Sequence, residues 1–398
     1  MIRNVFQAGF FSSVLLLAFI SSADSAPFIS GVVLNQNGQP LPGAFVHYRK
    51  NNVKDTTDNL GRYSIDVAAT SIKRADPFFT FDGVSPQGNK TEEKLYNLGG
   101  RLLSRSNYES LNLFIVKSLN NPPEIRANLS KSATGPSSQD SLFFAAFGKS
   151  PQTIGLQPNQ TNVADVTMRG TVTTYNGYTE YDFTIAGRAT KLVVPKTALP
   201  SKPWIWRCRF WDHWPEVDKA LLAMGYHLVY LDIIEWYGAP ISIGWWNQYY
   251  DLLTNYYGFN KKCVLEGMSR GGLTIFQWAL QKPNAVQAMY ADAVVADLRT
   301  YPGFAELQRT YGFKDSAEYK AYTGHPVDNL KILADVKVPI FLVVGDQDNL
   351  YARNMILESR YRALGGPIQV IVKPGVGHTH GLPSPKPIVD YVHSFLTN

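Results

Sequence analysis

The sequence predicts an α/β fold in which a doubly wound, mainly parallel sheet follows a small all-β sandwich. From about residue 170, short apolar runs alternate with helical patterns, which is typical of a parallel sheet with helices on both faces. Before that point, short strands separated by Gly and Asn turns predict a sandwich. A chain of 398 residues is long enough for these domains. We therefore expect the sandwich over residues 26–169 and the parallel sheet over residues 170–398.

The first 25 residues have the pattern of a cleavable signal peptide. Arg3 provides a positive end, VLLLAFI an apolar centre, and small residues follow. Because this apolar run is too short to span a bilayer, an uncleaved anchor is the less favoured alternative. No other segment is apolar enough to cross a membrane. We therefore expect a secreted or periplasmic protein without stable membrane insertion.

Composition and charge exclude several classes of protein. Hydrophobic residues make up 45% and charged residues 18%, which is typical of a globular protein. The net charge of +6 is spread along the chain without a long basic run, so we expect no nucleic-acid partner. The two cysteines, Cys208 and Cys263, are expected at opposite ends of neighbouring strands. They are therefore predicted to be buried thiols and not a disulfide.

The β-rich segment resembles a known family of small sandwiches. The matching strings are GVVLNQNGQPLPGAFVHYRK and, after it, TTDNLGRYSID, which together look like the carboxypeptidase regulatory-like domain. DSLFFAAFGKSPQTIGL and NVADVTM resemble the strand pair that ends this domain. The stretch from about 71 to 139 departs from the family, and we expect it to be an insertion.

A candidate nucleophile lies in the string VLEGMSRGGL. Gly267 to Gly271 match G-x-S-x-G between an apolar strand and a helical pattern, with Ser269 at the turn. Such a turn strains the serine backbone and exposes its hydroxyl at a helix N-terminus, where the backbone N–H of Arg270 can stabilise an oxyanion. A purely structural strand-to-helix turn with the same letters is the alternative.

The partners that such a serine requires follow later in the chain. A serine nucleophile needs a base, and the base needs an acid that orients it. The predicted strand PIFLVVG ends at Asp346-Gln347-Asp348, and IQVIVKPGVG leads to His378-Thr379-His380. Both groups follow strands at their carboxyl ends, where ligands of such a sheet bind.

The order of serine, acid and histidine resembles that of the α/β hydrolases. The resemblance implies that Asp348, in a G-x-x-D pattern, is the acid and that Asp346 caps the loop. It also implies that His378, in the G-H junction, is the base. His380 would then line the pocket or bond the loop, and a solvated loop histidine is the alternative.

The remaining site residues are expected around the serine. The backbone N–H of Arg207 or Cys208, after PWIWRC, is predicted to be the second oxyanion donor. His213, next to Asp212, either borders the cleft or caps the helix that begins near Pro215. The guanidinium of Arg270 either reaches a substrate oxygen or pairs with a carboxylate such as that of Glu266.

Residues 297–331 are long enough to form a small cap over the site. Four aromatic residues either line this cap or pack within it: Tyr301, Phe304, Tyr311 and Tyr322. A zinc site made from His378, His380 and an aspartate is disfavoured because H-E-x-x-H is missing. We expect no metal and no organic cofactor.

Four strings extend the resemblance from about residue 178 to the C-terminus: PWIWRCRFWDH, EGMSRGG, YADAVVADLRTYPG and IVKPGVGHTHGL. Together they look like the prolyl-oligopeptidase-like and dienelactone-hydrolase-like branch of the α/β hydrolases, and Ser269-Arg270 locally resembles the G-x-S-R of glucuronoyl methylesterases. The resemblance implies an exported serine carboxylesterase that acts on a glycan, at acyl or uronate methyl esters. A serine peptidase of the prolyl-oligopeptidase type and a binding or adhesion protein with a vestigial hydrolase domain are the alternatives.

Overall fold

The computed structural model describes residues 28–66, 94–96, 113–118, 121–127, 141–157, 163 and 165–396. The predicted signal peptide and most of the predicted insertion lie outside these residues. Within the insertion, the described strands β5 (Lys94–Tyr96), β6 (Leu113–Ser118) and β7 (Asn121–Ala127) form an antiparallel sheet in that order. No helix within the described ranges is long and apolar enough to cross a membrane.

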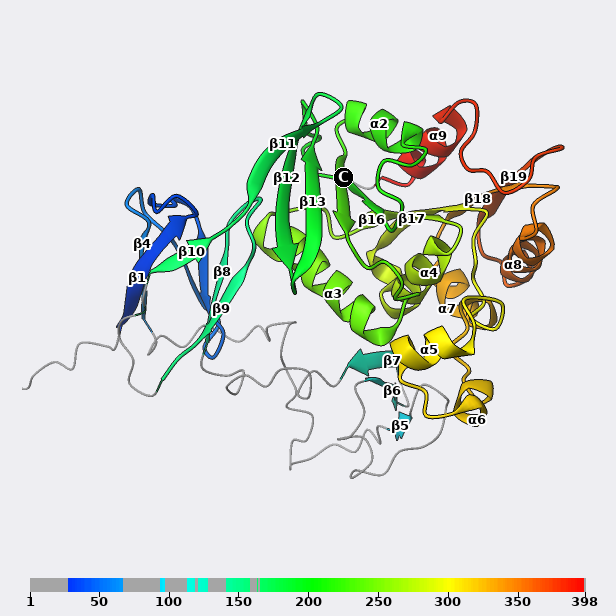
Figure 1. Cartoon of the computed structure of the whole chain (residues 1–398), viewed down its shortest axis with the longest axis horizontal. Coiled ribbons are helices and arrows are strands. Elements are labelled where there is room, and N and C mark those ends of the chain that lie inside the picture. Colours follow the sequence, from blue (N-terminus) through cyan, green and yellow to red (C-terminus); the bar gives the residue numbers. More distant parts are fainter. Residues whose placement is uncertain are drawn as a thin grey trace, which may run out of the picture.

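A nine-stranded sheet forms the centre of the C-terminal part (Figure 1). In sheet order its strands are β11 (Thr171–Tyr175), β12 (Tyr178–Ile185), β13 (Arg188–Val194), β15 (His227–Leu231), β14 (Trp204–Arg207), β16 (Cys263–Met268), β17 (Val286–Asp292), β18 (Ile340–Gly345) and β19 (Ile368–Lys373). The first three strands run antiparallel to their neighbours, and all pairs from β15 to β19 are parallel. The predicted mainly parallel sheet is confirmed.

Helices cover both faces of this sheet, which explains why strands such as β16 are buried along their whole length. The helices α2 (Glu216–Ala223) and α9 (Lys386–Ser394) pack on one face. The other face carries α3 (Pro240–Asp251) with the π-turn Leu252–Tyr256, α4 (Gly271–Gln281), α7 (Lys331–Asp335) and α8 (Tyr351–Ala363). Two short helices, α5 (Phe304–Tyr311) and α6 (Ser316–Lys320), lie in the predicted cap.

The two cysteines lie where the sequence predicts them. Cys263 opens β16, Cys208 directly follows β14, and both are free and buried. Burial raises the pKa of the Cys208 thiol to about 12, so this sulfur is a neutral core group.

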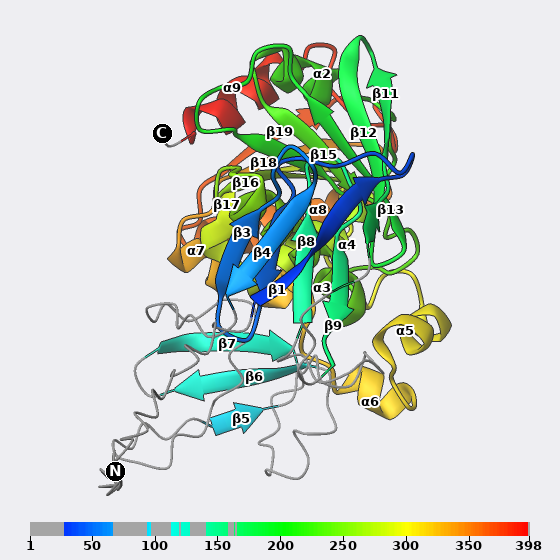
Figure 2. The ribbon, with the colours of Figure 1, turned by 90° about the vertical axis from the view of Figure 1, so that its left-hand side faces the viewer.

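The N-terminal part consists of two small sheets with a shared core (Figure 2). One sheet has the order β10 (Val166–Met168), β1 (Phe28–Asn35), β4 (Arg62–Asp66), and the other has the order β3 (Val53–Thr56), β2 (Phe45–Tyr48), β8 (Ser141–Ala145), β9 (Gln152–Gly155). Val33 and Tyr63 from the first sheet and Val46 and Phe144 from the second are buried in one cluster. This arrangement agrees with a β domain, and its assignment to the carboxypeptidase regulatory-like family stays a prediction.

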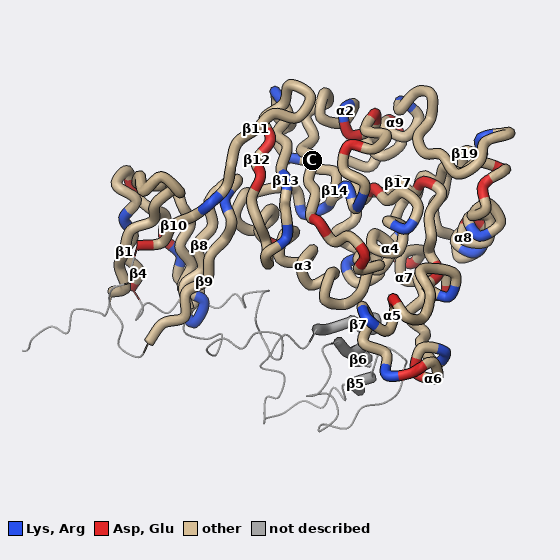
Figure 3. The backbone as a smooth tube through the Cα atoms, in the orientation of Figure 1, with Lys and Arg blue, Asp and Glu red and all other residues tan. Residues whose placement is uncertain are grey.

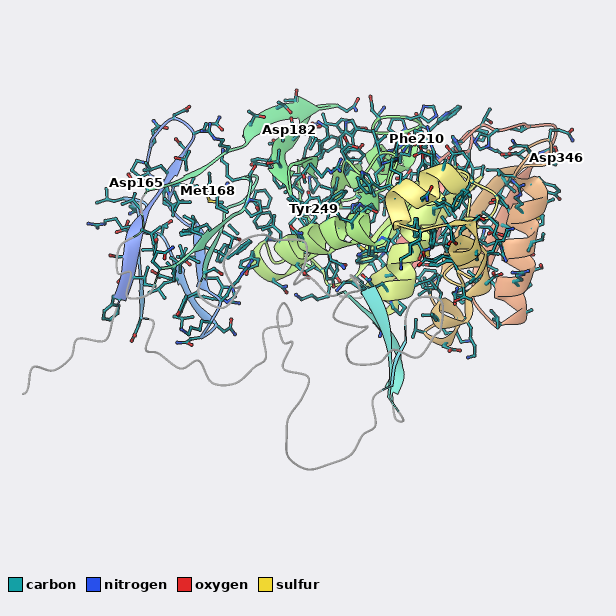
Figure 4. The ribbon with its side chains drawn as sticks, turned by 60° about the horizontal axis from the view of Figure 1, so that its bottom comes forward. Asp165, Met168, Asp182, Phe210, Tyr249 and Asp346 are labelled. Atoms are coloured by element: carbon teal, nitrogen blue, oxygen red, sulfur yellow. The ribbon has the colours of Figure 1, made fainter. Side chains whose placement is uncertain are left out.

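Aromatic contacts join the N-terminal sheets to the large sheet. The ring of Phe147 lies 5.2 Å from that of Tyr181 and 4.9 Å from that of Tyr257. The Tyr257 hydroxyl donates to the Ala146 carbonyl at 2.6 Å. His47 and the Tyr256 hydroxyl form a further hydrogen bond at 2.9 Å. Asp182, the residue after Tyr181, lies well away from Asp346 in the loop that follows β18 (Figure 4).

A protein that begins at Gly170 is expected to be less stable than the full chain. It loses Phe147 and returns the rings of Tyr181 and Tyr257 to water, and each exposed aromatic costs about 1.5–3 kcal/mol. We expect its Tm to fall by about 10 °C, with activity on small esters retained below that temperature. Thermal unfolding of the full chain, the truncated chain and the full-length Phe147→Ala variant measures this, and an unchanged Tm in the truncated chain would contradict it.

Candidate active site

Ser269 lies at a tight turn between β16 and α4. Its φ of 48° is in the left-handed region, which is strained for a serine and is common at functional sites. The turn is held by hydrogen bonds from the Ser269 N–H to the Asp292 carbonyl and from the Val295 N–H to the Ser269 carbonyl, both 2.9 Å long. The turn therefore depends on the strand end and the loop of neighbouring β17.

Steric contacts explain why two positions of VLEGMSRGGL are glycine. A Cβ on Gly267 would lie 2.7 Å from the Ile275 side chain, and a Cβ on Gly272 would lie 2.5 Å from Cβ of Val294. Only glycine lets the helix approach the strand and the next loop this closely.

His378 contacts both Ser269 and Asp348. Its Nε2 lies 3.0 Å from Oγ of Ser269, and its Nδ1 lies 2.8 Å from Oδ2 of Asp348. The Asp348 side chain is fully buried, and its other oxygen accepts the Leu350 N–H at 2.8 Å. An Nδ1–H that donates to this carboxylate leaves Nε2 free to accept the serine proton. The structure thus brings the three predicted residues together in the required order of contacts.

Asp346 does not reach the histidine. Its Oδ1 accepts the Gly375 N–H at 2.8 Å, so it joins the loops after β18 and β19. The predicted loop-capping role of Asp346 is confirmed by this bond.

His380 is buried, which contradicts the alternative of a solvated loop histidine. Its Nδ1 lies 3.4 Å from Oδ1 of Asp292, and its ring lies 5.1 Å from that of His378. Oδ2 of Asp292 accepts the Gly381 N–H at 2.6 Å and the Tyr290 hydroxyl. Asp292 thus connects the nucleophile turn to the histidine loop. Sequence reasoning missed it, although its place at the end of a buried strand was an available signal.

Removing the His380–Asp292 contact is expected to reduce activity without loss of the fold. In His380→Phe the ring volume stays, but the donor to Asp292 is lost and the His378 loop is less firmly placed. Small misplacements of reacting groups are costly, and we expect kcat to fall about 10-fold. His380→Asn, which keeps a donor, should recover part of the rate. Steady-state kinetics and Tm are measured for His380→Phe and for His393→Phe, a control variant on α9. An equal kcat in the two variants would refute the positioning role of His380.

The prediction of Cys208 or Arg207 as the second oxyanion donor is wrong. The Cys208 N–H donates to the Glu266 carbonyl at 2.9 Å. Arg207 lies within β14, paired with β15 and β16, so its backbone belongs to the sheet. The Cys208 N–H continues the pairing of β14 with β16 just past the end of the strand, so it is not free to bind an oxyanion.

The side chain of Arg207 belongs to a buried ionic cluster below the turn. It donates to Asp218 and, at 3.0 Å, to Oε1 of Glu266, and all three side chains are at most 1% exposed. Burial raises the pKa of Glu266 well above its usual range, although the nearby Arg207 guanidinium acts in the opposite direction. Glu266 contacts Arg207, and it is not the partner of Arg270.

Arg270 makes its contacts elsewhere. Its Nη1 donates to the Tyr301 hydroxyl at 2.8 Å and lies 3.3 Å from Oε1 of Glu235. The backbone N–H groups of Arg270 and Arg209 donate to no other residue in the described part of the chain. A Cβ on Gly271 would lie 3.5 Å from Cβ of Arg209, so the loop after β14 adjoins the start of α4. Arg209, which sequence reasoning missed, therefore replaces Cys208 as the candidate second donor.

His213 borders this site and caps no helix. Its exposed ring lies 5.9 Å from that of His380, and partial burial together with His380 lowers its pKa. Helix α2 begins after Pro215 without a side-chain cap, and Asp212 instead accepts the Tyr175 hydroxyl at 2.8 Å.

Most of the predicted cap residues pack against one another. Phe304, Tyr311 and Tyr322 lie against the buried cluster that contains Phe313. Tyr301 packs against this cluster too, and its hydroxyl also accepts a hydrogen bond from Arg270 beside the serine. Among the residues that the structure describes, no group of three or more potential ligands could hold a metal ion.

Comparison with known proteins adds to this geometry. The prolyl oligopeptidase family matches residues 249–397, which include Ser269, Asp348 and His378. The strand order, the strand-to-helix turn and this match decide the fold. The chain has the α/β-hydrolase fold. The site geometry and the family match together support a serine hydrolase of the α/β-hydrolase class.

Three of the solved structures that are similar to the chain share little sequence identity with it. An S-formylglutathione hydrolase from Agrobacterium tumefaciens is 14% identical, with 56% of this chain and 95% of that chain covered and a TM-score of 0.43. An S-formylglutathione hydrolase from Staphylococcus aureus is 15% identical, with coverages of 55% and 98% and a TM-score of 0.44. The fluorophosphonate-binding serine hydrolase F of Staphylococcus aureus is 13% identical, with coverages of 57% and 99% and a TM-score of 0.44. No curated protein matches the chain. Likeness at this level says nothing about the substrate.

Proposed function

We propose that the protein is an exported serine hydrolase that cleaves carboxylic esters on carbohydrates through an acyl-enzyme. The observation that carries the proposal is the position of His378 between Oγ of Ser269 and the buried carboxylate of Asp348. Export is inferred from the pattern of the first 25 residues.

The geometry supports the following steps. Nε2 of His378 takes the hydroxyl proton of Ser269 while Oγ attacks the ester carbonyl carbon. The N–H groups of Arg270 and Arg209 hold the oxyanion, and the protonated His378 gives its proton to the departing alcohol. Water, deprotonated by the same histidine, then attacks the acyl-enzyme and releases the acid and Ser269. The charge of buried Asp348 stabilises the imidazolium in both halves.

An exposed tryptophan beside the histidine loop supports a carbohydrate substrate. Trp214 is 43% exposed, and a Cβ on Gly381 would lie 3.1 Å from its ring. A flat aromatic surface with one open face can pack against the apolar face of a sugar ring. The prolyl oligopeptidase family match makes a serine peptidase the second candidate.

Labelling with a fluorophosphonate and a substrate panel test the proposal. We expect the label on Ser269, identified by mass spectrometry of peptides. We also expect higher kcat/KM for acetylated sugars or methyl uronates than for peptide amides. Faster cleavage of prolyl peptide amides would favour the peptidase. A folded protein that is neither labelled nor active would favour the binding or adhesion alternative.

A further inference from the structure

Two arginines form a pair beside Ser269, and we call Arg209 and Arg270 the arginine fork. Nη2 of Arg209 lies 2.7 Å and Nη1 of Arg270 lies 3.3 Å from the same oxygen, Oε1 of Glu235. Both guanidinium groups lie over the ring of Phe210, at 4.8 and 5.7 Å from its centroid. Phe210 is labelled in Figure 4. One carboxylate and one aromatic ring therefore hold two cations next to the nucleophile.

The fork has more donors than this carboxylate can satisfy. The Arg209 side chain is only 11% exposed, and its Nε is buried without a hydrogen-bond partner among the described residues. The second oxygen of Glu235 already accepts the Tyr237 hydroxyl. A buried donor without an acceptor costs about 1–3 kcal/mol, so its presence calls for a role. The Arg270 side chain, at 31% exposure, leaves the fork open to solvent.

The surrounding charges leave a local excess of positive charge. Arg309 donates to the Glu235 carbonyl at 2.8 Å but is paired with Glu306. Arg188 stacks over Trp236, the next residue after Glu235, at 5.4 Å. Elsewhere in the described hydrolase part, acidic and basic residues are interspersed (Figure 3). The excess is thus a feature of the fork and not of a whole basic face.

The residue that binds the arginine fork, Glu235, lies in a strained loop. It lies between β15 and α3 with a φ of 61°, and Tyr237 follows with a φ of 50°. Left-handed angles at two non-glycine residues are costly and occur where the surrounding contacts impose them. The Glu235 side chain is 39% exposed, so a carboxylate from solvent can compete for the same donors.

We propose that the arginine fork binds an anionic group of the substrate, the carboxylate of an acidic sugar, and that Glu235 holds its place in the free protein. This inference rests on the proposed esterase function and narrows it. The substrate is then an acyl ester on a sugar that also carries a free carboxylate. A uronate methyl ester is disfavoured because esterification removes the charge that the fork recognises.

Two substrates that differ in this charge test the inference. One is the acetylated methyl glycoside of galacturonic acid with a free carboxylate, and the other is the same compound with that carboxylate methyl-esterified. Acetate release by the full chain should be about 10-fold more efficient for the acid, mainly through a lower KM, the scale of one charge-assisted contact. Arg209→Gln should abolish the preference, and Glu235→Gln should increase it because the competing carboxylate is gone. Arg299→Gln, which removes an arginine paired with Asp297 and Asp328, is the matched control and should leave the ratio unchanged.

The outcomes separate this inference from the proposed function. No acetate release by the folded full chain from either substrate would overturn the esterase function itself. Release by Ser269→Ala at the rate of the unaltered protein would overturn the proposed acyl-enzyme mechanism. Active enzyme with equal efficiency on both substrates, or a ratio that Arg209→Gln and Glu235→Gln leave unchanged, would overturn only the anion subsite. If Arg209→Gln does not fold, Glu235→Gln still tests the anion subsite. A second test compares galacturonate with galactose as competitive inhibitors of the unaltered protein, and galacturonate should inhibit more strongly. Stronger inhibition by galactose 6-sulfate than by galacturonate would assign the fork to a sulfate and contradict the carboxylate.

Discussion

Ser269→Ala is expected to reduce kcat on an ester by about four to six orders of magnitude, the scale seen when a nucleophile that acts as one unit with its base is removed. The substitution deletes Oγ, the atom 3.0 Å from Nε2 of His378, and leaves the backbone turn in place. The fold should therefore survive. Stopped-flow and steady-state rates on an activated aryl ester measure the loss, and thermal unfolding checks the fold.

His378→Ala should lose a similar amount, because the serine hydroxyl is a poor nucleophile without its base. Ser359→Ala on α8, at an exposed serine that bonds only the Ile356 carbonyl, is the control and should keep full activity. Hydrolysis by Ser269→Ala at the rate of the unaltered protein would exclude the proposed acyl-enzyme.

The two aspartates after β18 are expected to differ by orders of magnitude. Asp348→Asn should lower kcat about 10⁴-fold, because an amide that donates to Nδ1 favours the tautomer with a proton on Nε2. That tautomer cannot take the proton of Ser269. Asp346→Asn should change kcat by less than about 3-fold, since its carboxylate only joins two loops.

Both variants conserve side-chain volume and remove one negative charge, so the comparison isolates the contact with His378. Steady-state rates on one activated ester are measured for both variants, and thermal unfolding checks that each variant folds. A greater loss in Asp346→Asn would show that the acid has been assigned to the wrong residue.

Sequence reasoning succeeded where function depends on the ends of buried strands. Ser269 directly follows β16, and Asp348 and His378 lie in the loops that follow β18 and β19. Strands of a parallel sheet end at one edge. The meeting of Ser269, Asp348 and His378 follows from this rule. The burial of the two thiols follows from the same placement.

Other features depend on contacts that no local pattern records. Glu235 reaches Arg209 and Arg270 because a strained loop turns it towards α4, and nothing in IIEWYG predicts that direction. The oxyanion prediction failed by a single position, because strand ends are uncertain by one or two residues. Glu266 was named as one possible partner of Arg270, but strand alternation places its side chain with those of Val264 and Met268 on the α2 face of the sheet, where it meets Arg207.

If the proposed glycan substrate is a polymer, the aromatic contacts between the N-terminal sheets and the large sheet limit how the proposed catalytic residues meet it. A domain on a flexible linker lets an enzyme sample a volume of substrate around its anchor, with an effective concentration set by the linker. Phe147, Tyr181 and Tyr257 remove that freedom here, since the two parts share packed side chains. An anchor on the N-terminal sheets would hold Ser269 at one distance and one orientation from the attachment point. The number of ester groups that the enzyme can reach from one attachment point would then depend on their spacing along the polymeric substrate, and not on their local density.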